Sequence, residues 1–503
     1  MTTGQAQKQQ TQKTSDKAMT QKAKTAITPT RDEDFPGWYQ NVIKAADFAE
    51  NSPVRGCMVI KPYGFALWEN IQRALDDMIK EEGVQNAYFP LLIPLSFISR
   101  EAEHVDGFAK ECAVVTHHRL EKGAEGGLVP APAAALEEPY VVRPTSETII
   151  GHSMAKWVQS YRDLPMKLNQ WCNVMRWEMR TRMFLRTSEF LWQEGHNAFA
   201  TADQANADAR KMLNVYNRLY TDWFAMPGIC GEKTADERFP GALHTYTIES
   251  MMQDGKALQA CTSHDLGLNF AKSFEIQYQG EDGAMHHAYT TSWGFSTRSI
   301  GGLIMAHGDD DGVILPPRLA PHQIALLPVV RDDDKAAVME ACQNLAVALK
   351  AKGIRVHFDD SDERTSDKMW RAIKKGVPLR VEMGPRDLES GTVVHTRREI
   401  GRDSKTSMNI NEFVDKAQAI LDDIQADLLR RAQASLDART FDLATLAEAR
   451  DFFADENSNG FVRIDSALLD HDDFQKLAKD FSVTPRCLPF ADEGRKAVIG
   501  KSY

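Results

Sequence analysis

The segment from Val174 to Phe199 holds residues whose types and spacing suit phosphate chemistry. Arg176 and Glu178 stand two residues apart, a loop follows, and Arg186 and Phe190 come after it, four residues apart. A guanidinium that is always charged can stabilise charge developing on phosphate oxygens through two directed hydrogen bonds. For an isolated Arg-x-Glu triplet, a structural ion pair on one face of a strand is the better interpretation. The ordered set therefore carries more information than the triplet.

Two further segments flank this one. Upstream, apolar residues at helical spacing predict a helix from Ala66 to Glu82, which Gly83 ends, and the chain continues to Pro90. Downstream, Gly294 to Arg298 precede a glycine-bearing helix that begins at Ser299. Taken singly, each arrangement is only a helix next to a strand.

In this order, the three segments resemble the three signature motifs of class II aminoacyl-tRNA synthetases. The resemblance implies a catalytic domain built on an antiparallel sheet, ATP with Mg²⁺ as a substrate, and a homodimer that uses the first motif. It also implies individual roles: Arg176 at the α-phosphate, Glu178 at the adenine edge, Arg186 and Arg298 at the γ-phosphate, Phe190 stacked on adenine, and Gln259 and Thr262 at the ribose. Arg176 and Arg298 would then be the catalytic residues.

Three more segments are similar to those of prolyl-tRNA synthetases of the archaeal and eukaryotic type: Arg143 to Glu147, Trp192 to His196, and Ser292 to Ser296. The similarity covers about residues 35 to 410 closely and the C-terminus more loosely. It implies a site for L-proline formed by these residues: Thr145 and Glu147 at the ring ammonium, Arg176 at the carboxylate, Trp192, His196 and Phe295 around the ring, and His264 and Ser296 beside them.

This chemistry is reasonable from the residue types alone. Proline is a compact apolar ring whose ammonium offers two donors, which a carboxylate and a hydroxyl can accept while aromatic walls exclude water. The substrate carboxylate is itself the nucleophile, so no general base is needed. Trp192 could equally be a residue of the core, and without the family resemblance a core role would be the better interpretation of His196 and His264. Glu178 and Glu249 are weak candidates for metal contacts, and no metal site of the protein itself is predicted.

The composition excludes several classes of protein. The 503 residues carry a net charge of −11, and the longest apolar run is too short to cross a bilayer, so no membrane association is expected. Net acidity argues against binding nucleic acid by bulk charge alone, although a local basic patch would suffice. Seven scattered cysteines without a Cys-x-x-Cys pair favour a reducing compartment, the cytoplasm.

The elements that must position these residues fall into an α+β chain with four parts. Residues 1–34, polar and lysine-rich at first, are expected to form a disordered tail. Residues 35–318 are expected to form the class II catalytic domain. Its expected elements are a helix from Phe35 to Ala49, an edge strand from Asn86 to Pro94, a surface loop over 121–139, strands over Tyr140–Val142, Lys167–Val174 and Phe190–Trp192, and a helix that Thr201 and Gln204 begin as a capping box.

Residues 319–408 alternate strand, helix, strand, helix and strand, which is typical of a small α/β domain. Within it, the segment from Gly376 to Asp387 resembles the anticodon-binding module of the same subgroup. The resemblance implies tRNA for proline as a partner, with Lys375, Arg380 and Glu382 as candidate contacts to anticodon guanines. Solvated strand charges are an equally good interpretation of these three.

The C-terminal part, residues 409–503, is expected to begin with a long charged helix and to end in short strands. Relatives in this subgroup usually hold a four-cysteine zinc site there, but Cys487 is the only cysteine beyond Cys342. One thiolate cannot form a tetrahedral structural zinc site, so no structural zinc is expected.

About 60 residues separate Phe199 from Gln259, which leaves no room for the editing domain of bacterial-type relatives. Two alternatives stay open at this point. One is a synthetase for another small amino acid such as threonine, against which the absence of Cys or His zinc ligands speaks. The other is a non-catalytic tRNA-binding relative, which intact Arg176, Arg298 and Phe190 disfavour.

Overall fold

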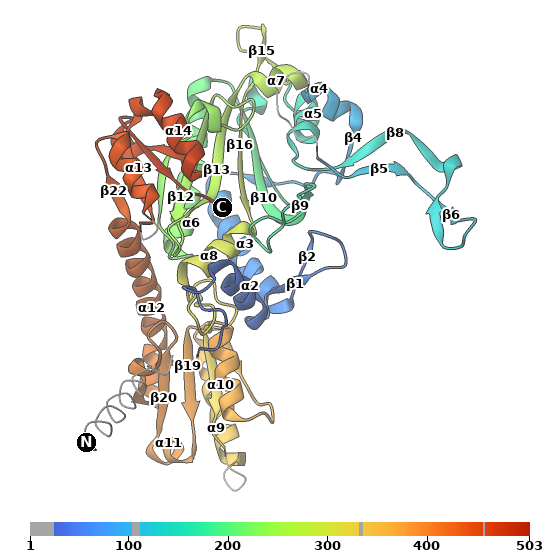
Figure 1. The fold of residues 1–503 in the computed structure, drawn as a ribbon. Coiled ribbons are helices and arrows are strands. Elements are labelled where there is room, and N and C mark those ends of the chain that lie inside the picture. The colour runs from blue at the N-terminus through green and yellow to red at the C-terminus, as the bar shows by residue number, and fades with distance from the viewer. Residues whose placement is uncertain (1–24, 103–110, 331–334, 456–457) are drawn as a thin grey trace, which may run out of the picture.

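The computed structural model of the chain describes residues 25–102, 111–330, 335–455 and 458–503. A large mixed sheet forms the upper body, a small five-stranded sheet lies below it, and the long helix α12 (Ile410–Ala438) runs along one side between them (Figure 1). The predicted α+β class is confirmed. In the described part of the chain, no helix is both long enough and apolar enough to cross a bilayer.

The large sheet has eleven strands, in the order β22-β23-β25-β24-β11-β12-β13-β16-β10-β9-β3. Its central antiparallel strands are β11 (Gly228–Glu232), β12 (His244–Met251), β13 (Ala257–Gly267), β16 (Tyr289–Ser296), β10 (Glu189–Phe199) and β9 (Met166–Met175). The prediction of antiparallel strands in this region is confirmed, but the strands are not short, since β9 has 10 residues and β10 and β13 have 11 each.

One face of this sheet is covered by α6 (Ala202–Asp222), on which α3 (Pro62–Glu81) packs. The hydroxyl of Thr201 caps α6 by accepting from the N–H of Gln204 at 3.3 Å, which is one half of the expected capping box. Next to them lie α2 (Phe35–Ala45) and α8 (Arg298–His307), and together these helices enclose the main apolar core. The opposite face of the central strands is left for the site.

Strand register decides which residues reach which face. Successive side chains of a strand point to opposite faces. On β10 the even-numbered residues from Phe190 to His196 share the open face, whereas Trp293 and Phe295 of β16 point to the core. Trp293 packs so closely on Gly195 that a Cβ there would lie 2.0 Å from the indole.

The small sheet has the order β18-β17-β19-β20-β21 and confirms the predicted alternation of strands and helices. Its elements are β17 (Ile324–Pro328), α9 (Lys335–Ala351), β18 (Val356–Phe358), α10 (Thr365–Lys374), β19 (Leu379–Met383), α11 (Pro385–Ser390), β20 (Thr392–Arg397) and β21 (Thr406–Asn409). Burial alternates along β19, and the apolar side chains of this sheet pack against α9 and α12.

The C-terminal strands continue the large sheet instead of forming a separate one. They are β22 (Thr440–Asp442), β23 (Phe461–Asp465), β24 (Thr484–Pro489) and β25 (Lys496–Gly500), with α13 (Leu446–Ala454) and α14 (Asp472–Phe481) packed on them. β24 pairs with β11 through Gly231 and Pro489. Where they meet, a Cβ on Gly231 would lie 2.9 Å from the sulfur of the buried Cys487, so the close approach requires glycine.

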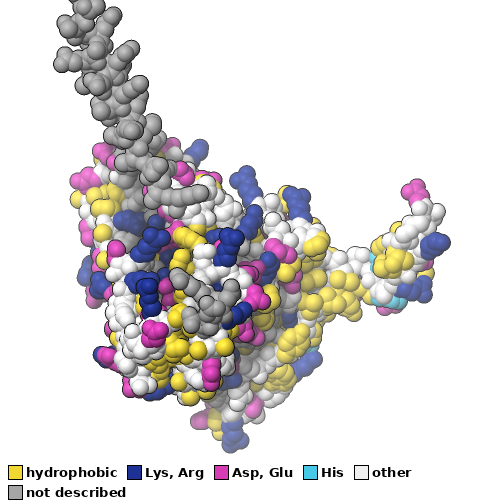
Figure 2. Space-filling model, turned by 90° about the horizontal axis from the view of Figure 1, so that it is seen from below, with side chains coloured by type: hydrophobic (Ala, Val, Ile, Leu, Met, Phe, Trp, Pro, Cys, Tyr) yellow, Lys and Arg dark blue, Asp and Glu magenta, His cyan; other side chains and the backbone are white. Residues whose placement is uncertain are grey.

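A projecting arm replaces most of the surface loop expected over 121–139, so that prediction is wrong. The arm consists of β5 (Val114–His117) and β8 (Ala135–Val142), extended by the hairpin of β6 (Leu120–Lys122) and β7 (Leu128–Pro130). Figure 2 shows it standing away from the body with hydrophobic side chains on its surface. Propensity indicated loops because alanine, glycine and proline dominate this stretch, but backbone pairing overrides that tendency.

The edge strand expected from Asn86 to Pro94 is divided into β3 (Gln85–Asn86) and β4 (Leu92–Pro94), which lie at the edges of two different sheets. The first helix ends at Ala45 instead of Ala49, because Asp47 takes a positive φ of 60° and the chain turns into the β1–β2 hairpin (Ala49–Asn51 and Met58–Ile60). The remaining elements are α4 (Leu95–Ala102), α5 (Glu147–Trp157), α7 (Asn269–Phe274), β14 (Gln277–Gln279) and β15 (Met285–His287).

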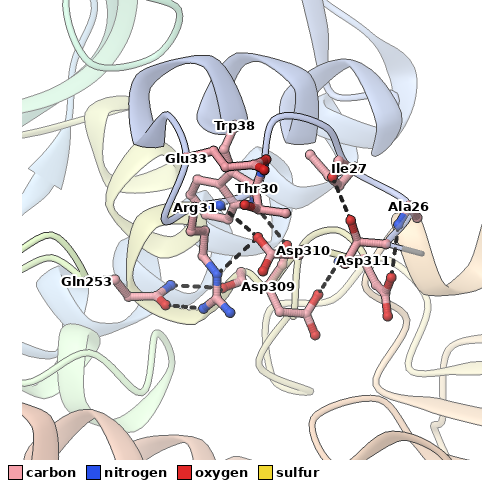
Figure 3. A network of polar contacts seen from close by, with 12 residues as sticks. Ala26, Ile27, Thr30, Arg31, Glu33, Trp38, Gln253, Asp309, Asp310 and Asp311 are labelled. Atoms are coloured by element: carbon pink, nitrogen blue, oxygen red, sulfur yellow. Dashed lines mark hydrogen bonds and ion pairs between the residues drawn. The ribbon is translucent and has the colours of Figure 1, made fainter. Parts of the chain in front are cut away.

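Residues 25–34 are ordered against the turn that follows α8, so the expected disordered tail does not extend over them (Figure 3). Ile27 is buried, and its N–H donates to the carbonyl of Asp310 at 2.8 Å. The backbone N–H of Arg31 donates to Asp310 Oδ1 at 2.8 Å, and the guanidinium contacts Gln253. The composition of this segment indicated disorder, because composition carries no information about binding partners that come from distant parts of the chain. The rest of the expected tail, residues 1–24, lies outside the described residues.

The same turn ties the small domain to the body. Both oxygens of Asp309 accept from the guanidinium of Arg398, at 2.6 and 2.7 Å, and the carbonyl of Asp309 accepts from the indole N–H of Trp38 at 3.0 Å. Arg398 is 8% exposed, which makes this a largely buried bidentate pair. The end of α8 is therefore where three parts of the chain meet.

Candidate active site

A cavity of about 270 Å³ opens on the uncovered face of the central strands. It collects twelve of the residues predicted from the sequence: Thr145, Glu147, Arg176, Phe190, Trp192, His196, Gln259, Thr262, His264, Phe295, Ser296 and Arg298. They come from β9 to β16 and from the starts of α5 and α8, so distant segments meet only in the folded chain. Three antiparallel neighbours, β10, β16 and β13, supply its floor.

A buried carboxylate stands at one end of the cavity. Glu147 is the first residue of α5 and is 8% exposed. The hydroxyl of Thr145, two residues earlier, donates to Glu147 Oε2. Helix N-termini favour negative charge, which helps to hold this carboxylate in a site that excludes most water. The pair offers acceptor oxygens to a cationic group in the cavity.

Glu194 and His196 form a second charged pair two residues apart on β10. His196 Nε2 lies 3.2 Å from Glu194 Oε2, and the amide of Gln170 donates to Glu194 Oε1 at 2.9 Å. Burial works against charge on both groups, but the contact with Glu194 and the nearby charge of Glu147 raise the pKa of His196. The pKa of Glu194 is lowered, because its hydrogen bonds and the charge of His196 outweigh its burial.

His264 is the opposite case. Burial, followed by the charge of His196, lowers its pKa to about 3, so the ring is neutral at ordinary pH. Its Nδ1 lies 3.0 Å from the hydroxyl of Thr245, and its ring centre is 4.6 Å from that of Phe239. The pKa values of the two histidines that face this cavity are thus displaced in opposite directions.

The arginines are held by backbone carbonyls. Arg176 Nε donates to the carbonyl of Pro144 at 3.0 Å, and its guanidinium carbon lies 5.5 Å from the ring centre of Phe190 and 5.7 Å from that of Trp192. Arg298 Nε donates to the carbonyl of Leu185 at 3.1 Å. Surrounding protein lowers the pKa of both, and for Arg298 the charge of Arg176 adds to this, yet a guanidinium stays charged at neutral pH.

Glu178 and Arg186 lie outside the residues that line the cavity. They pair with each other across the loop between β9 and β10, with Arg186 Nε 2.6 Å from Glu178 Oε2. Both fall on the segment whose motif resemblance suggested nucleotide contacts. The ion pair that Glu178 forms is therefore with Arg186, whereas the structural interpretation of the triplet had paired it with Arg176.

One of the predicted residues that line the cavity, Phe295, directs its ring into the core. Phe295 is 2% exposed, and its ring stacks on Trp68 at 6.1 Å and contacts aromatic residues of α6. The two-residue period of β16 sends Ser296 into the cavity and Phe295 into the core. The aromatic wall beside His264 comes instead from Phe239, in the loop before β12.

Sequence reasoning missed several residues that line the cavity, chiefly Glu194, Phe239 and Thr245, with Glu237 and Arg238 at its edge. The alternation of Trp192, Glu194 and His196 on one strand was a usable signal for Glu194. Phe239 and Thr245 had no comparable local signal, because only pairing of β12 with β13 sets Thr245 opposite His264.

The candidate anticodon residues do not act together. Arg380 and Glu382, on one face of β19, pair at 2.9 Å, and Lys405 lies 3.3 Å from Glu382. Lys375 lies away from them, 3.5 Å from a carboxylate oxygen of Asp47, with its ammonium over the ring of Tyr63. It therefore contacts the body of the protein.

Glu249 cannot serve as a metal contact while its carboxylate is occupied. Lys233 lies 2.8 Å from one oxygen, which also accepts from the hydroxyl of Thr247, and Arg486 donates to the other at 2.8 and 3.0 Å. Within the described ranges, no three or more His, Cys, Asp and Glu side chains are grouped so as to hold a metal ion.

Comparisons with known proteins agree with this geometry. A family model described as the tRNA synthetase class II core domain for the G, H, P, S and T enzymes matches residues 133–307, and one described as an anticodon binding domain matches residues 323–420. Proteins named proline–tRNA ligase are similar over most of their length. That of Rhodopirellula baltica is 54% identical over 96% of this chain and 97% of its own, and that of Bdellovibrio bacteriovorus is 54% identical over 94% and 95%.

Proposed function

The chain belongs to the proline–tRNA ligases, a family of class II aminoacyl-tRNA synthetases, and from that premise we propose how its own residues carry out the reaction. Such a ligase uses ATP to activate L-proline and then transfers the prolyl group to tRNA. The observation that carries the assignment is the Thr145 and Glu147 pair opening into the same cavity as Arg176.

The amino-acid subsite lies at the carboxylate end of the cavity. Glu147, with Thr145 beside it, accepts the two hydrogens of the proline ammonium, and Trp192 lies along the ring. Glu194 and His196, whose side chains lie 3.2 Å apart, form the floor of this subsite, and the charge of Glu147 helps to raise the pKa of His196. Phe239 and the neutral His264 form the wall that sequence reasoning had given to Phe295.

The two arginines act on the phosphates. In the first step a carboxylate oxygen of proline bonds to the α-phosphorus of ATP, and the bond from that phosphorus to the bridging oxygen breaks, which releases pyrophosphate. Arg176 stabilises the charge on the α-phosphate oxygens, and Arg298 does so at the γ-phosphate. In the second step a ribose hydroxyl of tRNA attacks the prolyl carbonyl and AMP leaves.

The remaining nucleotide contacts follow the motif assignment. Gln259 and Thr262, both in the cavity, hold the ribose, while Phe190 stacks on the adenine. Binding of ATP would separate Glu178 from Arg186 and pair the glutamate with the adenine edge and the arginine with the γ-phosphate. Mg²⁺ arrives with the ATP phosphates and neutralises part of their charge.

Three domains are proposed: a catalytic domain over 35–318, an anticodon-binding domain over 319–408, and a C-terminal domain over 409–503. The anticodon family match supports the second. Within it we propose that Arg380 and Glu382 on β19 contact the anticodon, whereas the contacts of Lys375 with Asp47 and Tyr63 favour a role between domains.

We further propose that the chain is of the archaeal and eukaryotic type, without an editing insertion. The segment between Phe199 and Gln259 is taken up by α6, β11 and β12, which all belong to the catalytic fold. Incubation with alanyl-tRNA for proline should give no hydrolysis above the spontaneous rate. Rapid hydrolysis would contradict this.

A zinc-free C-terminal domain, a homodimer and a cytoplasmic location also stay proposals. The domain's own apolar core and its strand pairing with β11 support stability without zinc. Metal analysis of the purified protein should find less than one zinc per chain, and light scattering after gel filtration should give twice the chain mass of 56.4 kDa.

Pyrophosphate exchange tests the function directly. With each of the twenty amino acids in turn, ATP–pyrophosphate exchange should be largest with proline. A larger rate with threonine would point to another synthetase, and no exchange with any amino acid would point to a non-catalytic relative. The variant Glu147→Gln keeps the side-chain shape but removes the charge, and it should raise the KM for proline much more than the KM for ATP.

A further inference from the structure

Helix α8 has the active site at one end and the segment 25–34, which we call the strap, at the other. Arg298, the first residue of the helix, lines the active-site cavity. The helix has 10 residues, so it is about 15 Å long. Most of these residues are buried, and a tightly packed interior deforms little. A shift at the far end of α8 would therefore reach Arg298.

Arg31 of the strap caps that far end. The last carbonyls of a helix have no partner within it. Here the carbonyl of Gly308, directly after α8, accepts from Gln253 Nε2 at 2.8 Å and from Arg31 Nη1 at 3.2 Å. The guanidinium also donates to the side-chain oxygen of Gln253, so the three groups all contact one another (Figure 3). A positive charge is favourable in this place, because the helix dipole is negative at its C-terminal end.

The turn after α8 holds Arg31 in this position. The N–H of Arg31 donates to Asp310 Oδ1 at 2.8 Å, and its Nε lies 3.4 Å from the same oxygen. Earlier in the strap, the N–H of Ala26 donates to Asp311 Oδ1 at 3.1 Å. The strap thus follows the turn over several residues, and this fixes where the Arg31 side chain can point (Figure 3).

Gln253 extends these contacts to the active-site sheet. It lies in the turn between β12 and β13, and its N–H donates to the carbonyl of Met305 in α8 at 3.4 Å. Its own carbonyl accepts from Arg439, directly after α12, at 2.7 Å. The strand that follows, β13, carries Gln259 and Thr262 of the cavity. The cap therefore fixes α8 relative to a strand that lines the site.

The direction of Arg298 depends on where α8 lies. Arg298 Nε donates to the carbonyl of Leu185 at 3.1 Å. A Cβ on Gly301, about one turn further along the helix, would lie 2.6 Å from the side chain of Leu185. The residue that holds the guanidinium thus also packs against the body of the helix. A displaced α8 would change both contacts together.

We propose that Arg31 is a positioning residue for proline activation: by capping α8 it sets where Arg298 meets the γ-phosphate of ATP, an inference that rests on the proposed function. Arg31 does not line the active-site cavity, so it acts through the helix and not on the reacting atoms. Misplacement of a group by about 1 Å can slow a reaction about a hundredfold. The strap therefore contributes to catalysis from outside the cavity.

The binding of ATP and of AMP separates a positioning role from a structural one. AMP has the adenine, the ribose and the α-phosphate but lacks the γ-phosphate that Arg298 is proposed to bind. In equilibrium dialysis, Arg31→Gln should weaken ATP binding about fivefold and leave AMP binding unchanged, because part of one charge-assisted contact is lost. Arg31→Lys should recover most of the loss, since it keeps a positive charge at the end of α8.

The matched control is Arg463→Gln, on β23 of the C-terminal domain. The side chain of Arg463 is 28% exposed, against 32% for Arg31, and it pairs with the carboxylates of Asp442 and Asp492. Thermal unfolding should show similar falls in the midpoint for Arg31→Gln and Arg463→Gln. Only Arg31→Gln should weaken ATP binding.

Two further measurements connect the effect to Arg298. In proline-dependent pyrophosphate exchange, Arg31→Gln should raise the KM for ATP about fivefold and leave the KM for proline unchanged. In dialysis, adding Arg31→Gln to Arg298→Ala should cause no further loss of ATP binding, because the side chain that Arg31 positions is already absent.

Three results would overturn the inference. Unchanged ATP binding in Arg31→Gln would show that the strap only stabilises the fold, and equal losses for ATP and AMP would show a general change of the site. A further loss in the Arg298→Ala background would show that Arg31 acts by another route. Absence of exchange in the unmodified protein would instead refute the proposed function itself.

Discussion

The buried cluster around Glu249 makes a sharp prediction about what joins the C-terminal domain to the active-site sheet. Glu249 is fully buried, and Lys233 and Arg486 contact its two oxygens while being only 2% and 6% exposed. Two cations thus share one anion, and Arg486 comes from β24 whereas Glu249 comes from β12. The cluster lies where the C-terminal strands continue the large sheet.

The charge that each substitution leaves unpaired should decide how far it destabilises the protein. Glu249→Gln leaves two buried cations without a counter-charge, which should cost about 3–5 kcal/mol. Arg486→Met leaves a neutral pair, Lys233 with Glu249 at 2.8 Å, supported by the hydroxyl of Thr247. It loses charge-assisted hydrogen bonds but also removes a buried charge, so the net cost should be about 1–2 kcal/mol.

Differential scanning fluorimetry checks this order, since the first unfolding transition should fall much further for Glu249→Gln than for Arg486→Met. Lys233→Met is the matched control, because it too leaves a neutral pair and should resemble Arg486→Met. If Arg486→Met were as damaging as Glu249→Gln, charge balance would not be the reason, and strand pairing through β24 would have to carry the junction. Zinc addition should not restore any of the variants.

Three more predictions concern the active site. Arg176→Ala should lower proline-dependent exchange roughly 100- to 1,000-fold, while tRNA binding measured by filter retention stays largely intact. His264→Gln should remove a pH dependence of stability: the depressed pKa of His264, about 3, favours the neutral form, so its contribution is complete above the unfolded value of 6.5 and is lost as pH falls. Measured by urea denaturation, the free energy of unfolding of the wild type, relative to that of this variant, should therefore fall by about 1.5 kcal/mol from pH 6.5 to pH 5. Gly195→Ala should destabilise by about 3 kcal/mol because its Cβ would meet Trp293. Gly294→Ala, whose nearest neighbour would be 3.7 Å away, should change the unfolding midpoint little, and equal losses for the two glycines would refute the packing argument.

The local pattern was enough for much of the fold. The start of α6 at the Thr201 cap and the alternation of strands and helices over 319–408 depend on neighbours within a few residues, and both were predicted. The arm over 121–139 and the segment 25–34 were not, because long-range pairing and contacts outweigh a composition that indicates loop or tail. The pairing of β24 with β11, through which the C-terminal strands continue the large sheet, has no signature in the sequence.

The sequence by itself indicated the ligase family: residue types at motif spacing predicted the arginines and the Thr145 and Glu147 pair as site residues, because the reaction requires groups of these kinds. Only the tertiary structure decided which side chains face the cavity. Phe295 turns to the core and Phe239 replaces it, Glu194 joins His196, and Lys375 pairs with Asp47. Strand register and the pairing of distant segments set these directions, and neither is a property of a short stretch of chain.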